Sequence, residues 1–204
     1  MPLPRTTPII VTEKPAIILA SASPRRHELL LQIQLQHQVQ AVEIDESCHN
    51  GETPQACAER LALIKAREVL LLNPESYVIG ADTIVSIDGK MLGKPVNRED
   101  GLQMLESLSA REHQVMTGVA VVCARQELSC VSRSKVTFKS LSKAEIMAYW
   151  DTGEPLDKAG AYAIQGIAAR FVKHLNGSFS GVMGLPLYET SRLLEESGAT
   201  APRT

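Results

Sequence analysis

The fold is decided by the stretch Ile17-Ile18-Leu19-Ala20-Ser21-Ala22-Ser23-Pro24-Arg25-Arg26-His27-Glu28-Leu29-Leu30. Its apolar start is typical of a β-strand, and the small residues that follow lead into a helix start signal, with Ser23 as N-cap and Pro24 at the first helical position. A strand that runs directly into a helix places free backbone N–H groups and the positive end of the helix dipole at the strand's tip. The stretch therefore predicts an anion site, with phosphate as its most typical occupant.

Two arginines, Arg25 and Arg26, occupy the first turn of this helix. Cations there oppose the helix dipole by about 0.3 to 1 kcal/mol each. Two in succession indicate that an anion normally lies among them, whereas the simpler alternative is a pair of solvated surface side chains. The dipeptide alone leaves both interpretations open.

The bulk composition favours a globular protein that acts on something small. The chain has 204 residues, 44% of them hydrophobic, which is enough for one domain with a sizeable core. The net charge of -2 gives no overall basic field, although it leaves room for a local basic pocket that binds a small polyanion. A small anionic substrate is therefore favoured over a stable nucleic-acid partner.

We expect a single domain over residues 16–197, between a flexible N-terminal arm of residues 1–15 and a flexible tail of residues 198–204. The longest apolar run in the arm is three residues, too short for a signal-peptide core. No window approaches the roughly 18 apolar residues of a membrane span. We therefore expect no membrane association and a cytoplasmic location.

The cysteines are Cys48, Cys57, Cys123 and Cys130, and they show neither C-x-x-C spacing nor a histidine at metal-ligand spacing. This argues against structural zinc and against a secreted disulfide framework, and it fits a reducing cytoplasm. Cys123 and Cys130 could face each other across a tight hairpin, but two buried free thiols are the more ordinary interpretation. We assign the cysteines no part in the chemistry.

Hydrophobic periodicity and capping signals predict both strands and helices. The expected strands cover residues 16–19, 38–44, 77–87, 90–92, 113–124, 128–138, 171–175 and 179–183. The expected helices cover residues 24–34, 54–72, 98–109, 143–152 and 186–196. Because the first half alternates strands and helices and the second half contains hairpins, we predict an α/β fold with a mixed twisted sheet flanked by helices.

Polar residues that interrupt apolar patterns mark the candidate site. Asp82 lies inside the strongest strand signal, where a carboxylate is costly unless it is paired, hydrogen-bonded or bound to a metal. It is the preferred catalytic candidate, with a purely structural aspartate as the alternative. Lys65 interrupts the apolar stripe of the second helix, and its amine either reaches the edge of the helix or points into a polar cavity toward a negative ligand.

Three further features complete the set. Glu46 ends the second expected strand, and Lys94 lies on a constrained loop before a proline. Residues 153–166 are rich in glycine and alanine, as in a binding loop whose backbone approaches a ligand, although a tight connection needs the same residues. Four cations with one or two carboxylates suit a triphosphate, because cations hold phosphate oxygens while carboxylates bind a divalent metal or take a proton from the attacking water. The sequence has no Walker loop and no G-x-G-x-x-G motif.

Several blocks, in order along the chain, resemble the Maf-like nucleotide pyrophosphatases. They are residues 19–26 with Glu28-Leu29-Leu30, Gly80-Ala81-Asp82-Thr83, Lys94-Pro95, residues 113–117, residues 157–162 with Ile164-Gln165-Gly166, and Gly184-Leu185-Pro186-Leu187. Ala163 departs from the family pattern, which has glycine at this position. The resemblance implies an inosine-triphosphatase-like fold with two lobes around a central cleft. It also implies hydrolysis between the α and β phosphates of a nucleoside triphosphate, a divalent cation (Mg2+ or Mn2+) and a homodimer.

By matching position, the resemblance implies a role for each candidate. The residues that would contact phosphate are Ser21, Arg25, Arg26, Lys65 and Lys94. Asp82 would be the proton acceptor or a metal-linked carboxylate, and Glu46 would help at the metal. The specificity positions would be Arg25, Thr83 and Gln165, of which Thr83 and Gln165 resemble the branch that acts on dTTP and UTP. A hydroxyl and a neutral amide can supply the donor and acceptor pattern of a uracil or thymine edge.

Two alternatives to a dTTP and UTP pyrophosphatase, which would also accept modified pyrimidine nucleotides, stay open at this point. A 7-methyl-GTP pyrophosphatase would hydrolyse that nucleotide in preference to UTP. A nucleotide-binding regulator of cell division would have no need of Asp82, so the intact set of charged residues argues against it.

Overall fold

A computed structural model of the chain describes residues 15–200. The strands are β1 (Ile17–Leu19), β2 (Gln38–Val39), β3 (Tyr77–Ile87), β4 (Lys90–Leu92), β5 (Glu112–Cys123), β6 (Gln126–Phe138) and β7 (Val172–Asn176). The α-helices are α1 (Pro24–Gln32), α2 (Pro54–Leu72), α3 (Arg98–Leu108), α4 (Lys143–Trp150), α5 (Phe179–Met183) and α6 (Leu187–Ser197). Two 3-10 helices, η1 (Ala159–Ala161) and η2 (Ile167–Phe171), precede β7. Of the predicted arm and tail, all but residue 15 and residues 198–200 lie outside the described range.

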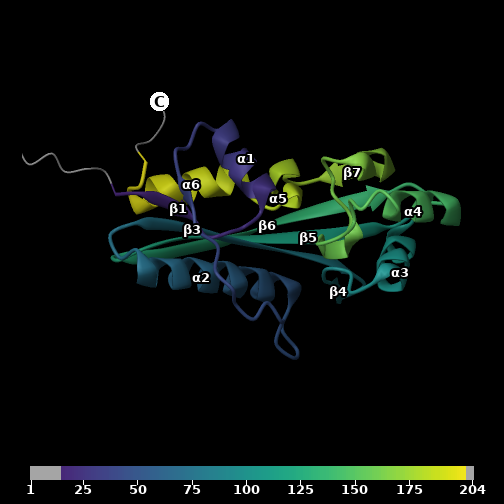
Figure 1. The fold of residues 1–204 in the computed structure, drawn as a ribbon, viewed down its shortest axis with the longest axis horizontal. Coiled ribbons are helices and arrows are strands. Elements are labelled where there is room, and N and C mark those ends of the chain that lie inside the picture. The colour runs from purple at the N-terminus through teal and green to yellow at the C-terminus, as the bar shows by residue number, and fades with distance from the viewer. Residues whose placement is uncertain (1–14, 201–204) are drawn as a thin grey trace, which may run out of the picture.

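The strands form one seven-stranded sheet in the order β2-β1-β3-β5-β6-β7, with β4 paired to β3 beside this path. β1 runs parallel to β2 and to β3, whereas the remaining pairs are antiparallel. Helix α2 covers one face of the sheet, and α1, α5 and α6 cover the opposite face (Figure 1). The predicted α/β fold with a mixed sheet flanked by helices is confirmed.

Side chains of the central strands alternate between these two helical layers. Leu19 and Ile79 pack in one apolar cluster with residues of α1 and α6, while their neighbours Ile18 and Val78 pack in another with residues of α2. This period of two buries both faces of the strands, which explains their nearly continuous apolar sequence.

Two glycines allow α2 to lie directly against the sheet. A Cβ atom at Gly80 would lie 2.1 Å from the carbonyl oxygen of Ala62, and one at Gly118 would lie 2.3 Å from that of Ala58. Asp82 is two residues beyond Gly80 and is the cross-strand partner of Gly118. Because alternate residues of a strand share a face, the side chain of Asp82 points toward α2.

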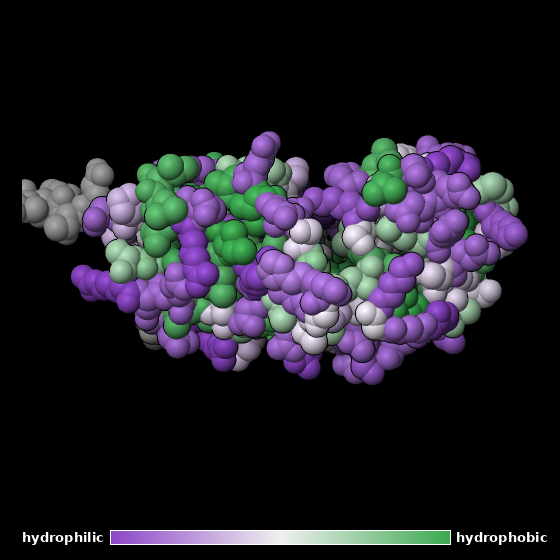
Figure 2. Space-filling model, turned by 90° about the horizontal axis from the view of Figure 1, so that it is seen from below, coloured by the Kyte–Doolittle hydropathy of each residue, from purple (hydrophilic) through white to green (hydrophobic). Residues whose placement is uncertain are grey.

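A third apolar cluster forms the other end of the molecule, where α3, α4, η1 and η2 surround the far part of the sheet. Its aromatic members include Phe138, Tyr149 and Phe171, whose rings meet edge to face. Figure 2, viewed from the α2 side, shows a notch in the outline between the two ends of the elongated molecule. The two predicted lobes are thus two ends of one sheet, with an apolar cluster on each face at one end and the third cluster at the other.

Two predicted strands are wrong in extent or type. β2 covers only two residues, so Glu46 lies on a loop and not at a strand end. Residues 179–183 form helix α5 and not the second strand of a hairpin, because Ser178 Oγ accepts a hydrogen bond from the backbone N–H of Gly181 (2.9 Å) and caps the helix. The Asn176-Gly177 pair, which is typical of a hairpin turn, precedes this cap and hides it.

The expectation that the cysteines stay unpaired is wrong for one pair. Cys48 and Cys57 form a disulfide with their Cα atoms 5.6 Å apart, because the first turn of α2 carries Cys57 back beside the preceding loop. Cys123 and Cys130 are free, but both are partly exposed and not buried. They do not face each other, since Cys123 pairs with Gln126 and Cys130 with Val119.

Candidate active site

The candidate site lies where one edge of β3 is open. β1 pairs with residues 77–79 of this edge and β4 with residues 85–87. Within the described chain, residues 80–84 between them have a partner strand only on the other side, where β5 runs. A cavity of about 610 Å³ opens at this gap. All the candidate residues line it, namely Ser21, Arg25, Arg26, Glu46, Lys65, Asp82, Thr83, Lys94 and Gln165.

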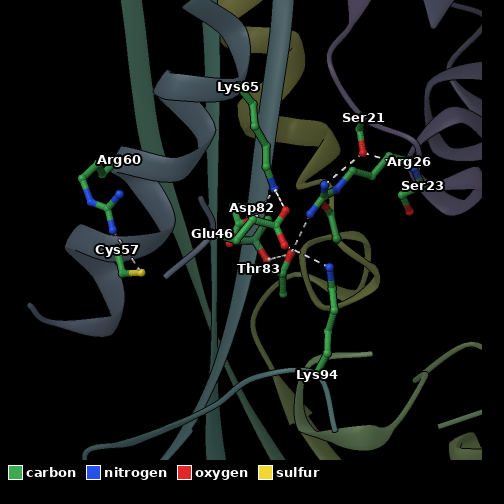
Figure 3. A network of polar contacts seen from close by, with 12 residues as sticks. Ser21, Ser23, Arg26, Glu46, Cys57, Arg60, Lys65, Asp82, Thr83 and Lys94 are labelled. Atoms are coloured by element: carbon green, nitrogen blue, oxygen red, sulfur yellow. Dashed lines mark hydrogen bonds and ion pairs between the residues drawn. The ribbon is translucent and has the colours of Figure 1, made fainter. Parts of the chain in front are cut away.

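Lysines and carboxylates alternate along one wall of the cavity. Lys65 Nζ donates to Asp82 Oδ1 and to Glu46 Oε1, both at 2.6 Å. Lys94 Nζ donates to Glu46 Oε2 at 2.9 Å. In Figure 3, Lys65 and Lys94 extend from opposite sides toward the two carboxylates. Of the two predicted placements of Lys65, the structure has the one in which the amine points into a polar cavity.

Burial and pairing oppose each other at Glu46. Desolvation raises the pKa of this carboxyl, but hydrogen bonds and charge from Lys65 and Lys94 outweigh it and hold the pKa at about 2. Glu46 is therefore ionised at neutral pH. The Lys65 and Asp82 side chains are only 8% and 12% exposed, so each charge depends on the other for compensation.

Arg26 joins the start of α1 to the opposite face of β3. Its Nε donates to the carbonyl oxygen of Gly184 (2.7 Å), its Nη1 to Ser21 Oγ (3.1 Å) and its Nη2 to Thr83 Oγ1 (3.4 Å). Desolvation lowers the pKa of Arg26, and the nearby charge of Asp82 opposes this shift. The guanidinium is thus held in one orientation beside the cavity.

The first turn of α1 is open toward the cavity. Ser23 occupies the N-cap position as predicted, but its side chain accepts no capping hydrogen bond. Arg25 is half-buried at the cavity wall, and desolvation lowers its pKa against the opposing charges of Asp157 and Glu28. The positive end of the helix and its arginines therefore meet in the cavity, as the opening stretch of sequence predicts.

Residues 153–166 form a second wall of the cavity and carry Gln165. Gly160 donates its N–H to the carbonyl oxygen of Gly93 (3.0 Å), and the hydroxyl of Tyr162 is 2.9 Å from His113 Nε2. Within residues 15–200 the exposed side chain of Gln165 has no hydrogen-bond partner. This segment is anchored from behind and leaves its amide free to meet a ligand.

Arg60 is a residue that sequence reasoning missed. Its guanidinium donates twice to Glu52, at 2.8 Å each, and once to the carbonyl oxygen of Ser47 at 3.0 Å. It thereby braces the loop that carries Glu46. The signal was weak, because the partners lie eight residues apart across a helix start and no periodic pattern joins them.

Cys48, Glu52 and Cys57 place potential metal-ligand atoms within 4.8 Å of one another. The two sulfurs form a disulfide, and Glu52 forms a salt bridge with Arg60. This group therefore has no free thiolate to bind a metal. The carboxylates of Asp82 and Glu46 are the better donors for a hard divalent cation, since both converge on one point at Lys65 Nζ.

None of the helices in residues 15–200 combines the length and apolar character needed to cross a bilayer. The architecture is similar to that of the Staphylococcus aureus Ham1 protein, with a TM-score of 0.54 and 12% identity over 89% of this chain and 99% of that one. This likeness supports the inosine-triphosphatase-like fold alone.

Closer relatives are found by sequence. A dTTP/UTP pyrophosphatase of Colwellia psychrerythraea is 53% identical over 89% of this chain and 88% of its own length. Another, of Acinetobacter baylyi, is 49% identical over 87% of this chain and 97% of its own length. A third, of Alkalilimnicola ehrlichii, is 52% identical over 90% of this chain and 93% of its own length. The profile of the family described as "Maf-like protein" matches residues 16–197, and the chain belongs to this family.

Proposed function

We propose that the protein hydrolyses dTTP and UTP, and modified pyrimidine nucleotides of the same shape, to the nucleoside monophosphate and pyrophosphate. The observation that carries the proposal is the convergence of Asp82 and Glu46 with Arg26, Lys65 and Lys94 on one cavity that Gln165 also lines. The relatives named dTTP/UTP pyrophosphatases support the substrate class.

The cations bind the triphosphate. Arg26 is already oriented by three hydrogen bonds, and Arg25 and Lys94 lie at the same cavity. Fixed positive groups stabilise the charge that develops on phosphate oxygens without reorganising during the reaction. Ser21 lines the same wall and adds a hydroxyl.

Asp82 acts as the base for the attacking water. Its Oδ1 accepts from Lys65, which holds the carboxylate in place inside a strand. As the water attacks the α-phosphorus, its proton passes to the Asp82 carboxylate while the bond to the bridging oxygen of pyrophosphate breaks. Lys65 stays close to both carboxylates and balances the charge at this point.

Asp82 and Glu46 also fit a divalent cation, because they supply the carboxylate oxygens that Mg2+ and Mn2+ prefer. When bound, such an ion would neutralise phosphate charge and polarise the α-phosphate. Lys65 donates to both carboxylates and Lys94 donates to Glu46, so these side chains hold the ligands in place when no substrate is bound.

The base is recognised by the wall that residues 153–166 form. The free amide of Gln165 can donate to and accept from the edge of uracil or thymine. Thr83 Oγ1 is already bonded to Arg26 and to Thr117, so we infer that it contributes to specificity by positioning Arg26. A neutral amide offers no attraction to the positive charge of 7-methylguanine.

We also propose that the protein is located in the cytoplasm, where nucleoside triphosphates are found, and works as a homodimer. Light scattering after gel filtration would measure the mass against the 22.2 kDa of the single chain.

The test is a panel of dTTP, UTP, CTP, GTP and 7-methyl-GTP with Mg2+ or Mn2+, with pyrophosphate as the measured product. We expect dTTP and UTP to be hydrolysed fastest. Preferential hydrolysis of 7-methyl-GTP would refute the specificity. Binding of UTP without hydrolysis of any nucleotide, by both the unmodified protein and an Asp82→Asn variant, would instead favour a regulatory protein.

A further inference from the structure

Residues 41–53 form a loop between β2 and α2, called here the Glu46 loop, with no helix or strand of its own. Glu46 and Cys48 both belong to it and both line the cavity. Because this loop has no ladder of backbone hydrogen bonds, its position depends on the groups that tie it to α2 and to Lys94.

Three kinds of tie hold the Glu46 loop. Lys65 and Lys94 donate hydrogen bonds to the Glu46 carboxylate, and Arg60 donates to the carbonyl oxygen of Ser47 and to the Glu52 carboxylate. The third tie is the Cys48–Cys57 disulfide, which is the only cross-link within residues 15–200 and is attached two residues beyond Glu46. The first two would compete with phosphate, metal and solvent for the same charged groups, whereas the disulfide keeps its hold on the loop.

Cys48 and Cys57 differ in their exposure to solvent. Cys48 is partly exposed at the cavity wall, whereas Cys57 is fully buried in the first turn of α2. A small thiolate can therefore reach the Cys48 sulfur, with Cys57 as the leaving group. Arg60 Nη2 lies 3.8 Å from Cys57 Sγ, where it can stabilise the negative charge that develops on the departing sulfur (Figure 3).

We infer that Cys48 and Cys57 form a thiol–disulfide exchange site, taking low-molecular-weight thiols as reactant, whose redox state sets the order of the Glu46 loop. An external thiolate bonds to the Cys48 sulfur as the Cys48–Cys57 bond breaks, and Cys57 leaves as a thiolate. A second external thiolate then attacks the external sulfur of the mixed disulfide and releases Cys48, so that two thiols become one external disulfide and the protein gains two electrons and two protons.

Reduction of the disulfide changes how firmly Glu46 is held. In the reduced protein the Glu46 loop loses its covalent tie, and a larger part of the ensemble has Glu46 away from Lys65. This inference rests on the proposed function where it concerns activity, because Glu46 then has to be ordered again when a divalent cation and substrate bind. In a reducing compartment a lone disulfide is typically redox-sensing and not merely structural.

The experiment compares the full chain after treatment with dithiothreitol or with oxidised glutathione. Alkylation followed by mass spectrometry assigns the state of each cysteine. Hydrogen exchange at the Ser47, His49 and Glu52 amides, which donate hydrogen bonds within the Glu46 loop, should be at least about tenfold faster after reduction, as expected when a local tie is lost. The Mg2+ concentration for half-maximal pyrophosphate release should rise about three- to tenfold, with a smaller change in kcat.

Matched variants distinguish the effect of the Cys48–Cys57 pair from any effect of Cys123 and Cys130. The double variant Cys48→Ser, Cys57→Ser should behave like the reduced protein under both treatments, and the double variant Cys123→Ser, Cys130→Ser should keep the full response. Equal exchange of residues 41–53 in the verified oxidised and reduced proteins would overturn the inference, as would failure of oxidised glutathione to restore the bridge. If neither form hydrolyses any nucleotide, the proposed function fails, and the exchange rates of the Glu46 loop alone decide this inference.

Discussion

The two walls of the cavity hold their functional groups in opposite ways. On one wall Lys65, Asp82 and Glu46 compensate one another's charges, and Arg26 is fixed by three hydrogen bonds. On the other wall Gln165 has no hydrogen-bond partner within the described chain, although the segment behind it is anchored to the core. Groups that would handle phosphate are thus assembled in advance, and the group that would recognise the base is left free.

This difference follows from the cost of burying charge. Unpaired charged groups in a half-closed cavity would be destabilising by several kcal/mol, so Lys65 and Lys94 are paired with carboxylates even without substrate, and Arg26 is hydrogen-bonded to three neutral oxygens. An exposed amide carries little desolvation cost and needs no partner. Substitutions on the two walls should therefore have different effects on stability and on specificity.

The largest effect is expected on the preassembled wall at Asp82. The Asp82→Asn variant should lose about 10³-fold in kcat, because a group that takes the proton in the transition state is removed while the amide keeps the shape. Pyrophosphate release measures the rate, and circular dichroism checks the fold. The matched control is Asp88→Asn at the exposed β3–β4 turn, where less than about twofold change is expected. Similar losses in both variants would show that Asp82 has no special role.

Lys65 and Lys94 provide a matched pair within the same wall. Lys65→Met should lower the free energy of unfolding by about 3 kcal/mol, because two carboxylates lose a buried partner. Lys94→Met should lower it by less than about 1 kcal/mol, because this side chain is 60% exposed. Urea denaturation at neutral pH measures both. Equal losses would contradict the account of a charge-compensated interior.

The contact between His113 and Tyr162, which anchors residues 153–166, should make the stability of the protein depend on pH. Desolvation lowers the pKa of His113 to about 4, so the unfolded chain takes up the proton first as the pH falls. Stability should therefore be complete above about pH 6.5 and decrease by about 3 kcal/mol toward pH 4. Urea midpoints between these pH values measure the slope. The His113→Asn variant should flatten it, and an unchanged slope in that variant would refute the assignment to His113.

The smallest effect on stability is expected at Gln165. Gln165→Glu should leave the free energy of unfolding within about 0.5 kcal/mol of the unmodified protein, because the residue is exposed. The ratio of kcat/KM for UTP to that for 7-methyl-GTP should fall by about 10- to 100-fold, since a carboxylate opposes a uracil acceptor and attracts a methylated guanine. An unchanged ratio would place base recognition elsewhere.

Local signals predicted much of the fold. The strand over residues 77–87 has the predicted bounds, because a β-rich run ends at an Asp-Gly turn. Helix α2 also has the predicted bounds, because Thr53 caps it immediately before Pro54. Helix α5 was missed because the turn pair at residues 176–177 masked the cap at Ser178, and the disulfide was missed because pairing depends on the path of the loop.

The sequence predicted which residues line the site, but not which of them pair with one another. A polar residue in an apolar pattern reveals that a compensating partner exists, so Lys65 and Asp82 could be singled out from sequence. That they compensate each other depends on Gly80 and Gly118, which let α2 approach the sheet. Arg60 gave no such signal, because an arginine on a partly polar helix face is ordinary. The roles of these residues in catalysis stay predictions until variants are measured.

The central claim is cleavage between the α and β phosphates, and the identity of the products tests it most directly. Phosphorus NMR of UTP turnover in the presence of Mg2+ should show UMP and pyrophosphate in equal amounts from the earliest time points. Formation of UDP and inorganic phosphate would contradict the claim, because the water would then have attacked the γ-phosphorus and the site would be organised around a different bond.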